Sequence, residues 1–378
     1  MTRVLHINAG NLFGGVESFL VTLAREARLA PGMQPSFAVS FQGRFSEELA
    51  RHGWPVHCLG PVRLSRPGSV LRARRALAAA LRSHAVDVVV CHQAWSHAVF
   101  GPVVRRARLP LVLWCHTAGT TGHWLDRWAR GTPPDLVVAN SRFTAGIVAP
   151  AFPLATIAWV YCPLTVPTMP APEWSRDAVR KALDTPPRDV VFAQVGRLDP
   201  VKGHHTAIAA FERIADVPGW TYWIVGGPQR DADDRMLVSL RQAVRAAGLD
   251  GRVRFIGERR DVPDLLRAAD VYVQPNTGPE AFGLSLVEAL AAGLPVITSG
   301  IGGACEIVDD SCGVLVPPGD VGALASELRR FALVDALRAS LGREARRRPD
   351  LLCNVPRQLA RIHHILAGAA ARRLALVS

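Results

Sequence analysis

The stretch Glu280-Ala-Phe-Gly-Leu-Ser-Leu-Val-Glu288 is followed directly by Ala-Leu-Ala-Ala-Gly-Leu-Pro-Val-Ile, so that two acids stand eight residues apart. Gly283 permits a sharp turn close to a ligand, residues 284–292 favour a helix with an apolar stripe, and Gly293 is typical of a helix end. We therefore expect Glu280 in a loop and Glu288 within the helix that follows.

The start of such a helix offers N–H groups that have no partner inside the helix, and these groups favour an anion such as a nucleotide diphosphate. A carboxylate beside a diphosphate is repelled by it, and accepts hydrogen bonds from neutral hydroxyl groups instead. Two acids around an anion site therefore indicate a sugar nucleotide. A solvated helix glutamate is the commoner explanation of either acid alone. The apolar neighbours of Glu288 favour a carboxylate that reaches a cleft or a buried partner.

The segment resembles the Glu-x7-Glu signature of the retaining glycosyltransferases with the GT-B fold, family 4 in particular, and Phe282-Gly283 strengthens the resemblance. A second motif, Gly196-Arg197-Leu-Asp-Pro-Val-Lys202-Gly, follows a strand-like run. Glycine lets the chain turn at a strand end, where ligands of open α/β sheets bind. Arginine can hold a phosphate with two hydrogen bonds, while lysine supplies a compact charge. In the family this motif holds the donor pyrophosphate.

The first half of the chain matches this family more loosely. Gly14-Gly15 joins a strand to a helix without the Gly-x-Gly-x-x-Gly pattern of dinucleotide-binding enzymes. In the family a similar loop borders the acceptor and the transferred sugar, although glycine pairs are also ordinary turns. His116 follows the expected strand 111–115, where a family histidine touches the donor sugar. A lone histidine is more often a structural hydrogen-bonding group.

The resemblance implies a site made of a few charged side chains and of backbone that lies close to the donor. Its catalytic residues would be Arg197, Lys202, Glu280 and His116. Its donor-binding residues would be Gly196, Glu288, Phe282, Gly283, Leu284, Gly15 and Gly14. Asp231-Ala-Asp233 resembles a metal-binding Asp-x-Asp pair, but its polar surroundings favour solvated carboxylates. We expect no essential metal and no cofactor besides the sugar-nucleotide co-substrate.

Apolar strand-like runs alternate with helical stretches in both halves of the chain, which indicates doubly wound parallel sheets. The expected strands are 4–8, 36–41, 86–91, 111–115 and 135–139 in the first half, and 190–195, 221–225, 253–256, 270–274 and 296–298 in the second. Residues 163–172 are proline-rich and are the expected linker, because neither a helix nor a central strand tolerates such a run.

We therefore expect two Rossmann-like domains, over residues 1–165 and 166–355, and a final helix over residues 356–378. The resemblance implies that the N-terminal domain binds the acceptor, that the C-terminal domain binds the donor, and that the final helix packs back on the first domain. The resemblance implies the α/β GT-B fold, in which two facing Rossmann-like doubly wound domains enclose a cleft and the C-terminal helix crosses back.

Composition bounds the environment of the chain. Seven scattered cysteines without a Cys-x-x-Cys pair argue against a disulfide framework, and no apolar run is long enough for a signal peptide or a bilayer span. We expect a cytoplasmic protein. The net charge of +12 suits an anionic membrane surface or acceptor better than nucleic acid, since the basic runs lack interleaved aromatic residues. Lysine occurs only as Lys181, which is typical of a solvated surface, and Lys202.

The predicted activity is retaining, hexosyltransferase-type transfer of a sugar from a UDP- or GDP-linked donor to an acceptor hydroxyl. Glycolipid, cell-surface polysaccharide or glycoside biosynthesis would use such a reaction, with a lipid-linked or small-molecule acceptor and peripheral contact with the inner membrane face. Two alternatives remain: a nucleotide-sugar epimerase on the same fold, and a non-catalytic protein that binds sugar nucleotides.

Overall fold

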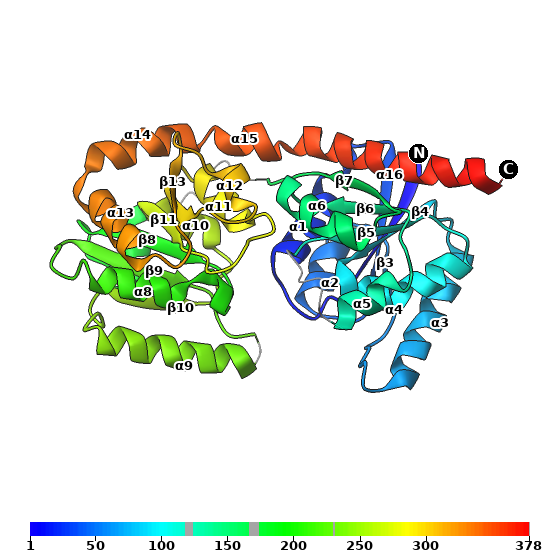
Figure 1. Ribbon diagram of the computed structural model, residues 1–378, viewed down its shortest axis with the longest axis horizontal. Helices are drawn as coiled ribbons and strands as arrows, with labels where there is room; N and C mark the ends of the chain where they lie inside the picture. The colour runs from blue at the N-terminus through cyan, green and yellow to red at the C-terminus, as the bar shows by residue number, and fades with distance from the viewer. Residues whose placement is uncertain (118–123, 166–173, 230, 378) are drawn as a thin grey trace. The chain divides into compact units, whose positions relative to one another are not determined.

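The computed structural model describes residues 1–117, 124–165, 174–229 and 231–377. The chain divides into two compact units (Figure 1). The first unit comprises Met1–Pro163 together with Cys353–Ser378, and the second comprises Leu164–Leu352. Residues 166–172 of the expected linker lie outside the described residues.

The first unit is built on a parallel sheet of seven strands in the order β3-β2-β1-β4-β5-β6-β7. The strands are β1 (Thr2–Asn8), β2 (Met33–Val39), β3 (Val56–Cys58), β4 (Val88–His92), β5 (Leu111–Cys115), β6 (Leu136–Ala139) and β7 (Thr156–Trp159). The order reverses between β1 and β4, and ligands of doubly wound sheets bind at the carboxyl ends of strands beside such a switch point.

Helices cover both faces of this sheet (Figure 1). They are α1 (Gly15–Glu26), α2 (Arg44–Ala50), α3 (Pro67–Ser83), α4 (Gln93–Arg106), α5 (Trp124–Arg130), α6 (Arg142–Val148) and α16 (Val355–Val377), with 3-10 turns η1 (Ala27–Leu29) and η2 (Ala149–Ala151). Side chains that alternate along the strands separate the two faces. Leu5 and Val89 pack with α3 and α4, whereas His92 and Trp114 pack against Phe19 of α1. Helix α16 contacts β1, β4 and η1.

The second unit holds a parallel sheet of six strands in the order β10-β9-β8-β11-β12-β13. The strands are β8 (Val190–Val195), β9 (Trp220–Val225), β10 (Val253–Gly257), β11 (Val271–Gln274), β12 (Val296–Ser299) and β13 (Gly313–Val316). β8 and β11 are neighbours at the switch point of this sheet. The loops that follow these two strands therefore leave the sheet at the same edge.

One face of the second sheet is covered by α8, α9 and α13, whose apolar residues form one core with the strands (Figure 1). The helices of this unit are α7 (Arg176–Ala182), α8 (His204–Glu212), α9 (Asp231–Ala246), α10 (Val262–Ala268), α11 (Leu284–Ala291), α12 (Ala304–Ile307), α13 (Val321–Leu333), α14 (Asp335–Ala345) and α15 (Arg348–Cys353), with the 3-10 turn η3 (Pro200–Lys202). α10 packs on α7, on α11 and on β8.

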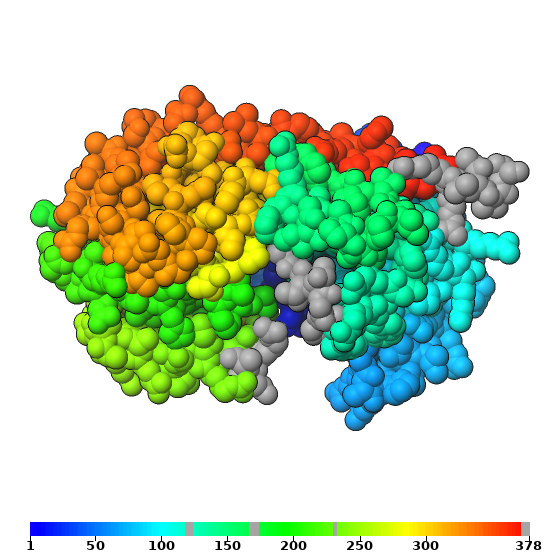
Figure 2. All heavy atoms as spheres, in the orientation of Figure 1, coloured from blue at the N-terminus to red at the C-terminus, as the bar shows by residue number. Residues whose placement is uncertain are grey.

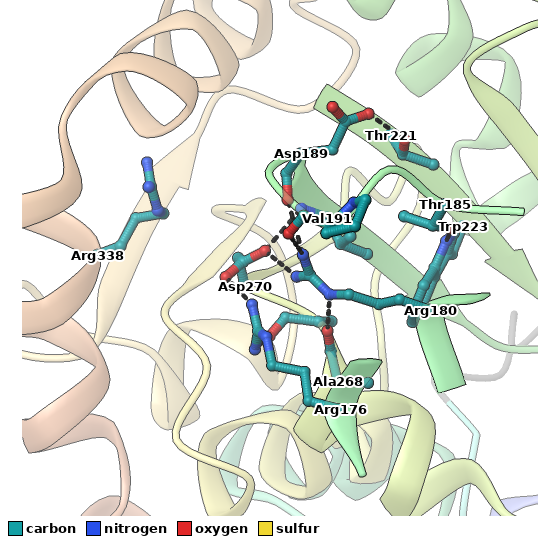
Figure 3. A network of polar contacts seen from close by, with 12 residues as sticks. Arg176, Arg180, Thr185, Asp189, Val191, Thr221, Trp223, Ala268, Asp270 and Arg338 are labelled. Carbon is teal, nitrogen blue, oxygen red and sulfur yellow. Dashed lines mark hydrogen bonds and ion pairs between the residues drawn. The ribbon is translucent and has the colours of Figure 1, made fainter. Parts of the chain in front are cut away.

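A buried arginine anchors α7 to this sheet (Figure 3). Only 2% of Arg180 is exposed, and its guanidinium donates to the carbonyls of Ala268, Pro187 and Asp189 at 2.9–3.1 Å. It also pairs with the carboxylate of Asp270, and this carboxylate accepts the backbone N–H of Val191 in β8 at 2.8 Å. Lys181, the next residue of the helix, is exposed as predicted.

The predicted alternation of strands and helices is confirmed. Each expected strand overlaps an observed one, and the expected C-terminal helix over residues 356–378 matches α16. Three strands were not predicted: β3, β7 and β13. All three lie at an edge of their sheet, where one side of the strand is unpaired and its residues are only partly buried.

Candidate functional site

The loop after β8 is held in a fixed shape by its backbone. The Gly196 N–H donates to the Val225 carbonyl at 2.9 Å, and the carboxylate of Asp199 accepts the N–H of Val201 at 3.0 Å at the start of η3. Gly203 follows with φ +70°, and a Cβ there would lie 1.8 Å from the carbonyl oxygen of Pro275. Only glycine fits, because any side chain would separate this loop from the loop after β11.

Lys202 and Glu280 meet between these loops. The Lys202 ammonium forms an ion pair with Oε2 of Glu280, and each side chain is 19% exposed. The side-chain amides of Gln274 and Asn276 also approach Oε2 of Glu280, each at 3.4 Å. The predicted cation and the predicted acid are therefore brought together, and amide donors hold the carboxylate in place.

A buried polar network supports this pair from beneath. Nε2 of Gln194 donates to the Lys202 carbonyl at 2.7 Å, while Oε1 of Gln194 accepts the hydroxyl of Tyr222. Oε1 of Gln274 accepts the Ser285 hydroxyl at 3.0 Å, which ties the loop after β11 to the first turn of α11. These contacts fix the backbone of both site loops.

Arg197 lies in the same loop but is held more loosely. Its guanidinium reaches Oδ2 of Asp199 at 3.4 Å, and 37% of its side chain is exposed. A guanidinium that keeps most of its N–H groups in water can turn toward an anion at small cost. The two cations of the motif therefore differ, because Lys202 is paired and partly buried whereas Arg197 remains available.

Glu288 lies in α11, as predicted, and Glu280 lies in the loop before it. Val287, Ala289 and Leu290 are buried, and the Glu288 side chain lines a cavity of about 80 Å³. The other lining residues are Leu164, Thr165, Val262, Pro263, Leu266, Arg267 and Ala292. Within the described residues nothing donates a hydrogen bond to this carboxylate. Loss of solvent raises its pKa to about 7.

The start of α11 is shaped by glycines. Gly283 is the residue before the helix and has φ +106°. Gly302 and Gly303 pack on the backbone of residues 280–282, where a Cβ on either would lie within 2.6 Å of a backbone atom. Phe282 is only 2% exposed, so its ring belongs to the core and only its backbone can border a ligand. Leu284 and Ser285 begin the helix, where their N–H groups have no carbonyl one turn earlier in the helix.

In the first unit, the Gly14–Gly15 loop and His116 follow β1 and β5. The carboxylate of Glu17 accepts the Gly14 N–H at 3.0 Å and the amide of Asn8 at 2.7 Å, which fixes the loop at the end of β1. His116 is 9% exposed, and its Nε2 contacts Nδ1 of His92 at 2.8 Å. Burial lowers the His116 pKa to about 3, so the ring is neutral.

The Asp231-Ala-Asp233 segment differs from its prediction. It begins α9 instead of lying in a polar loop, and Asp233 is 2% exposed and accepts the N–H of Gln229 at 3.0 Å. Asp233 is therefore a buried residue at a helix start and not a solvated carboxylate. Among residues 1–117, 124–165, 174–229 and 231–377, no group of three or more His, Cys, Asp or Glu side chains could hold a metal ion.

Sequence reasoning missed the amides that hold Glu280. Gln274 and Asn276 are fully buried polar residues at the end of β11 and just beyond it. Polar residues at the carboxyl end of an otherwise apolar strand were the available signal, since buried polar groups require a partner. His6 was missed in the same way, and it lies on β1, next to the switch point of the first sheet.

Two parallel sheets of seven and six strands with helices around them are similar to the structures of GT-B glycosyltransferases. Solved structures agree with this fold. Anabaena HepE in complex with UDP and glucose superimposes with a TM-score of 0.85 at 24% identity, over 97% of this chain and 100% of that one. WaaG, a glycosyltransferase involved in lipopolysaccharide biosynthesis, gives a TM-score of 0.73 at 17% identity, over 97% and 100%.

Sequence comparison gives the family. Residues 13–165 match the model described as Glycosyltransferase Family 4, and residues 175–348 match Glycosyl transferases group 1. The 2-deoxystreptamine N-acetyl-D-glucosaminyltransferase of Streptomyces fradiae is 31% identical over 362 residues, which are 82% of this chain and 80% of that protein. The chain belongs to the group 1 glycosyltransferases of family 4, a family of transferases.

Other relatives match over shorter segments. The D-inositol 3-phosphate glycosyltransferase of Salinispora tropica is 33% identical over 235 residues, which are 56% of this chain and 47% of that protein. The chain spans less than half the length of the first five curated relatives. Within the described residues, no helix combines the length and apolar character needed to cross a bilayer.

Proposed function

We propose that this protein is a retaining glycosyltransferase that moves a hexosyl group from a UDP- or GDP-linked sugar to an acceptor hydroxyl. The observation that carries the proposal is the Lys202–Glu280 pair, where the loops after β8 and β11 meet. One segment, residues 280–288, also carries Glu288 into a cavity of the same unit. The second unit thus supplies both a cation that can bind phosphate and carboxylates that can accept hydrogen bonds from hydroxyl groups.

The donor roles follow from the chemistry of each group. Arg197 and Lys202 would bind the diphosphate, and the N–H groups at the start of α11 would add to their field. Glu280, once Lys202 turns to the phosphate, would accept hydroxyls of the donor sugar together with backbone at Phe282 and Gly283. Glu288 would accept the ribose hydroxyls, since its cavity has the apolar walls that suit a nucleoside.

The proposed chemistry is front-face substitution. The bond between the anomeric carbon and the diphosphate oxygen breaks, and its electron pair leaves with the diphosphate. The acceptor oxygen bonds to the same face of the anomeric carbon, and its proton passes to a phosphate oxygen of the leaving group. No protein nucleophile is required, so the contribution of Arg197 and Lys202 is to stabilise the charge that grows on the leaving diphosphate.

Known complexes and relatives support a nucleotide-sugar donor. HepE has been crystallised with UDP and with UDP-glucose. Several relatives are named for cyclitol acceptors, namely D-inositol 3-phosphate, phosphatidyl-myo-inositol and 2-deoxystreptamine. We therefore infer that a small polyhydroxylated ring, free or lipid-linked, is the acceptor class to test first.

The acceptor is proposed to bind the first unit, near Gly14, Gly15 and His116. In support, a cavity of about 60 Å³ opens at the ends of β4 and β5. Its lining mixes apolar walls with the polar side chains of Gln93, Thr117, Asp126, Arg130 and Thr144. Such a mixture suits a polyol, whose ring packs on apolar groups while its hydroxyls find hydrogen-bond partners.

A basic surface on α3 supports a lipid-linked acceptor. Figure 2 shows this helix as a ridge that stands out from the first unit. Its exposed arginines, with those of the preceding loop, are Arg63, Arg66, Arg72, Arg75 and Arg82. Exposed guanidinium groups attract anionic lipid at close range, each contributing up to about 1 kcal/mol. We propose peripheral contact with an anionic membrane, which binding to vesicles with and without anionic lipid would test.

Catalysis is proposed to be independent of a metal ion, because Arg197 and Lys202 supply the positive charge that a divalent cation would otherwise bring. Turnover should therefore be unchanged by EDTA. A loss of activity in EDTA that added Mg²⁺ or Mn²⁺ restores would contradict this part of the proposal.

Turnover with a panel of UDP- and GDP-linked sugars tests the whole proposal. We expect release of free UDP or GDP that depends on an added cyclitol acceptor, and a product that keeps the anomeric configuration of the donor. Interconversion of the donor sugar without an acceptor would indicate an epimerase. Donor binding without any product would indicate a non-catalytic protein.

A further inference from the structure

Three histidine rings form a continuous hydrogen-bonded chain behind the first unit's site. Nδ1 of His6 lies 3.0 Å from Nε2 of His92, and Nδ1 of His92 lies 2.8 Å from Nε2 of His116. The residues come from three neighbouring strands, β1, β4 and the end of β5. His116 is at the carboxyl edge of the sheet, and His6 is at the inner end of the chain.

The histidine chain is enclosed by aromatic residues. His92 and His116 stack on Trp114, with ring centroids 5.6 and 5.8 Å apart, and His6 stacks on Phe37 at 5.6 Å. His6 and His92 are at most 1% exposed. Burial lowers the pKa of all three histidines, to about 3 for His6 and His116, and neighbouring rings lower the pKa of His92 and His116 further. Each ring is therefore neutral near pH 7.

Three neutral rings carry three N–H protons, and the two contacts between rings consume two of them. The third proton must sit at one end of the chain. Either it is on Nδ1 of His116, and every ring carries its proton on Nδ1, or it is on Nε2 of His6, and every ring carries its proton on Nε2. The protonation forms of the three rings are therefore coupled, so the environment of His6 determines whether Nδ1 of His116 carries a proton that it can donate to a ligand.

The two ends have different surroundings. Nε2 of His6 is buried and has no hydrogen-bond partner. A buried N–H without a partner is rarer in proteins than an acceptor atom without one. Nδ1 of His116, by contrast, belongs to a residue at the edge of the sheet that retains 9% exposure. A proton at this end can find a ligand or water.

We propose that His6 and His92 are positioning residues that hold His116 in its Nδ1–H form, so that it donates a hydrogen bond to an oxygen of the ligand bound by the first unit. The effect on this ligand rests on the proposed glycosyltransferase function, whereas the protonation state of the three rings does not. His6 does not touch the ligand in this arrangement. It acts only by giving its Nδ1 proton to His92, which in turn gives its own to His116.

Nitrogen-15 NMR of the full protein, labelled at histidine, reads the proton positions directly. At pH 7 we expect His6, His92 and His116, assigned from single substitutions, each to show a protonated Nδ1 and an unprotonated Nε2. A protonated Nε2 on His116 would overturn the proposal, whatever the turnover assays show. A failure of the glycosyltransferase assays alone would leave the NMR result standing.

Two variants of His6 test the coupling. His6→Leu removes the N–H that His6 donates to His92, so His116 should become a mixture of its two protonation forms. We expect kcat to fall about tenfold, which corresponds to the loss of one hydrogen bond, and KM for the sugar nucleotide to stay nearly unchanged. His6→Asn keeps an N–H near the position of Nδ1 and should restore both the His116 spectrum and most of kcat. His97→Leu removes a buried histidine of α4, outside the chain of three, whose only hydrogen bond within the described residues is to the Thr132 carbonyl. It should lower stability without changing kcat.

An unchanged His116 spectrum and unchanged kcat in His6→Leu would refute the proposal. Should His6→Leu fail to fold, His6→Asn and the spectrum of the unsubstituted protein still decide it. Restoration of folding but not of the His116 spectrum by His6→Asn would also count against the proposal.

Discussion

The Lys202 ammonium and the Glu280 carboxylate form an ion pair that joins the loop after β8 to the loop before α11. This pair must open at least in part if Lys202 is to bind a diphosphate, because the ammonium then directs its N–H groups to phosphate oxygens instead of to the Glu280 carboxylate. Glu280 does not become an isolated buried charge when this happens, since the amides of Gln274 and Asn276 remain beside it. The loops are therefore built to lose the pair without losing their shape.

Replacing Lys202 should reduce catalysis with little effect on the stability of the fold. We expect Lys202→Ala to lower kcat/KM by about 100-fold or more, as removal of one charge-stabilising group does, while the unfolding temperature falls little. The chain offers a matched control, because Lys181 is its only other lysine and is exposed. Lys181→Ala should behave like the unsubstituted protein. Equal turnover in both variants would remove Lys202 from the site.

Gly203→Ala should disrupt the site through the backbone. The new Cβ would lie 1.8 Å from the Pro275 carbonyl oxygen, and φ at this position is +70°. Gly219→Ala is the control, since its φ is +71° and no atom lies within 4 Å of the added Cβ. Both variants carry the strain of an alanine at positive φ, which costs about 1–2 kcal/mol in each. Chemical denaturation should show a clearly larger loss for Gly203→Ala, accompanied by weaker donor binding that Gly219→Ala does not show.

Glu288 should make stability depend on pH. Its pKa is raised from 4.5 to about 7 in the folded protein, so the folded state binds the proton more tightly than the unfolded state does. This acid therefore lowers the stability of the fold as pH rises from about 4.5 to 7, and the loss persists at higher pH. Glu288→Gln should be close to neutral at pH 4.5 and stabilising at pH 8, on the order of 1–2 kcal/mol because the carboxylate keeps some solvent contact.

Urea denaturation at the two pH values measures this difference. Glu212→Gln, at the exposed end of α8, controls for the loss of a negative charge. A difference in unfolding free energy between Glu288→Gln and the unsubstituted protein that is equal at pH 4.5 and at pH 8 would contradict the raised pKa. The variant should also weaken binding of the nucleoside diphosphate, because an amide accepts ribose hydroxyls less well than a carboxylate.

Arg180 should carry much of the stability of the second unit. Arg180→Met removes bonds to three carbonyls and to Asp270, and we expect a loss of about 3 kcal/mol because these buried acceptors lose their donor. Arg329→Met breaks an exposed pair with Asp216, which solvent screens, and should cost far less. Comparable losses in the two variants, measured by thermal unfolding, would show that the Arg180 network does not anchor α7.

The sequence predicted the elements whose residues carry a strong local pattern. Buried central strands such as β8 are largely apolar runs, and the glycines around α11 mark its start and end. The edge strands β3, β7 and β13 lack that pattern because half of their surroundings is solvent. Glu280 and Lys202 were found through motifs 78 residues apart in sequence.

Long-range partners of buried polar residues could not be predicted in this way. Arg180 and Asp270 lie 90 residues apart, and neither stands in a motif. His6 and His92 are separately ordinary strand residues and His116 follows a strand, and only the parallel register of β1, β4 and β5 brings their rings into contact. Register is a property of the whole sheet, so no local pattern contains it.

Calorimetric titration with UDP and GDP tests the central claim most directly, since it needs neither the donor sugar nor the acceptor to be known. We predict that one nucleoside diphosphate binds the unsubstituted protein and the Lys181→Ala variant with the same Kd, and that Lys202→Ala and Arg197→Ala each weaken binding at least about tenfold, the loss of one charged contact. Absence of binding by both nucleotides, or equal Kd values in all four proteins, would contradict the account.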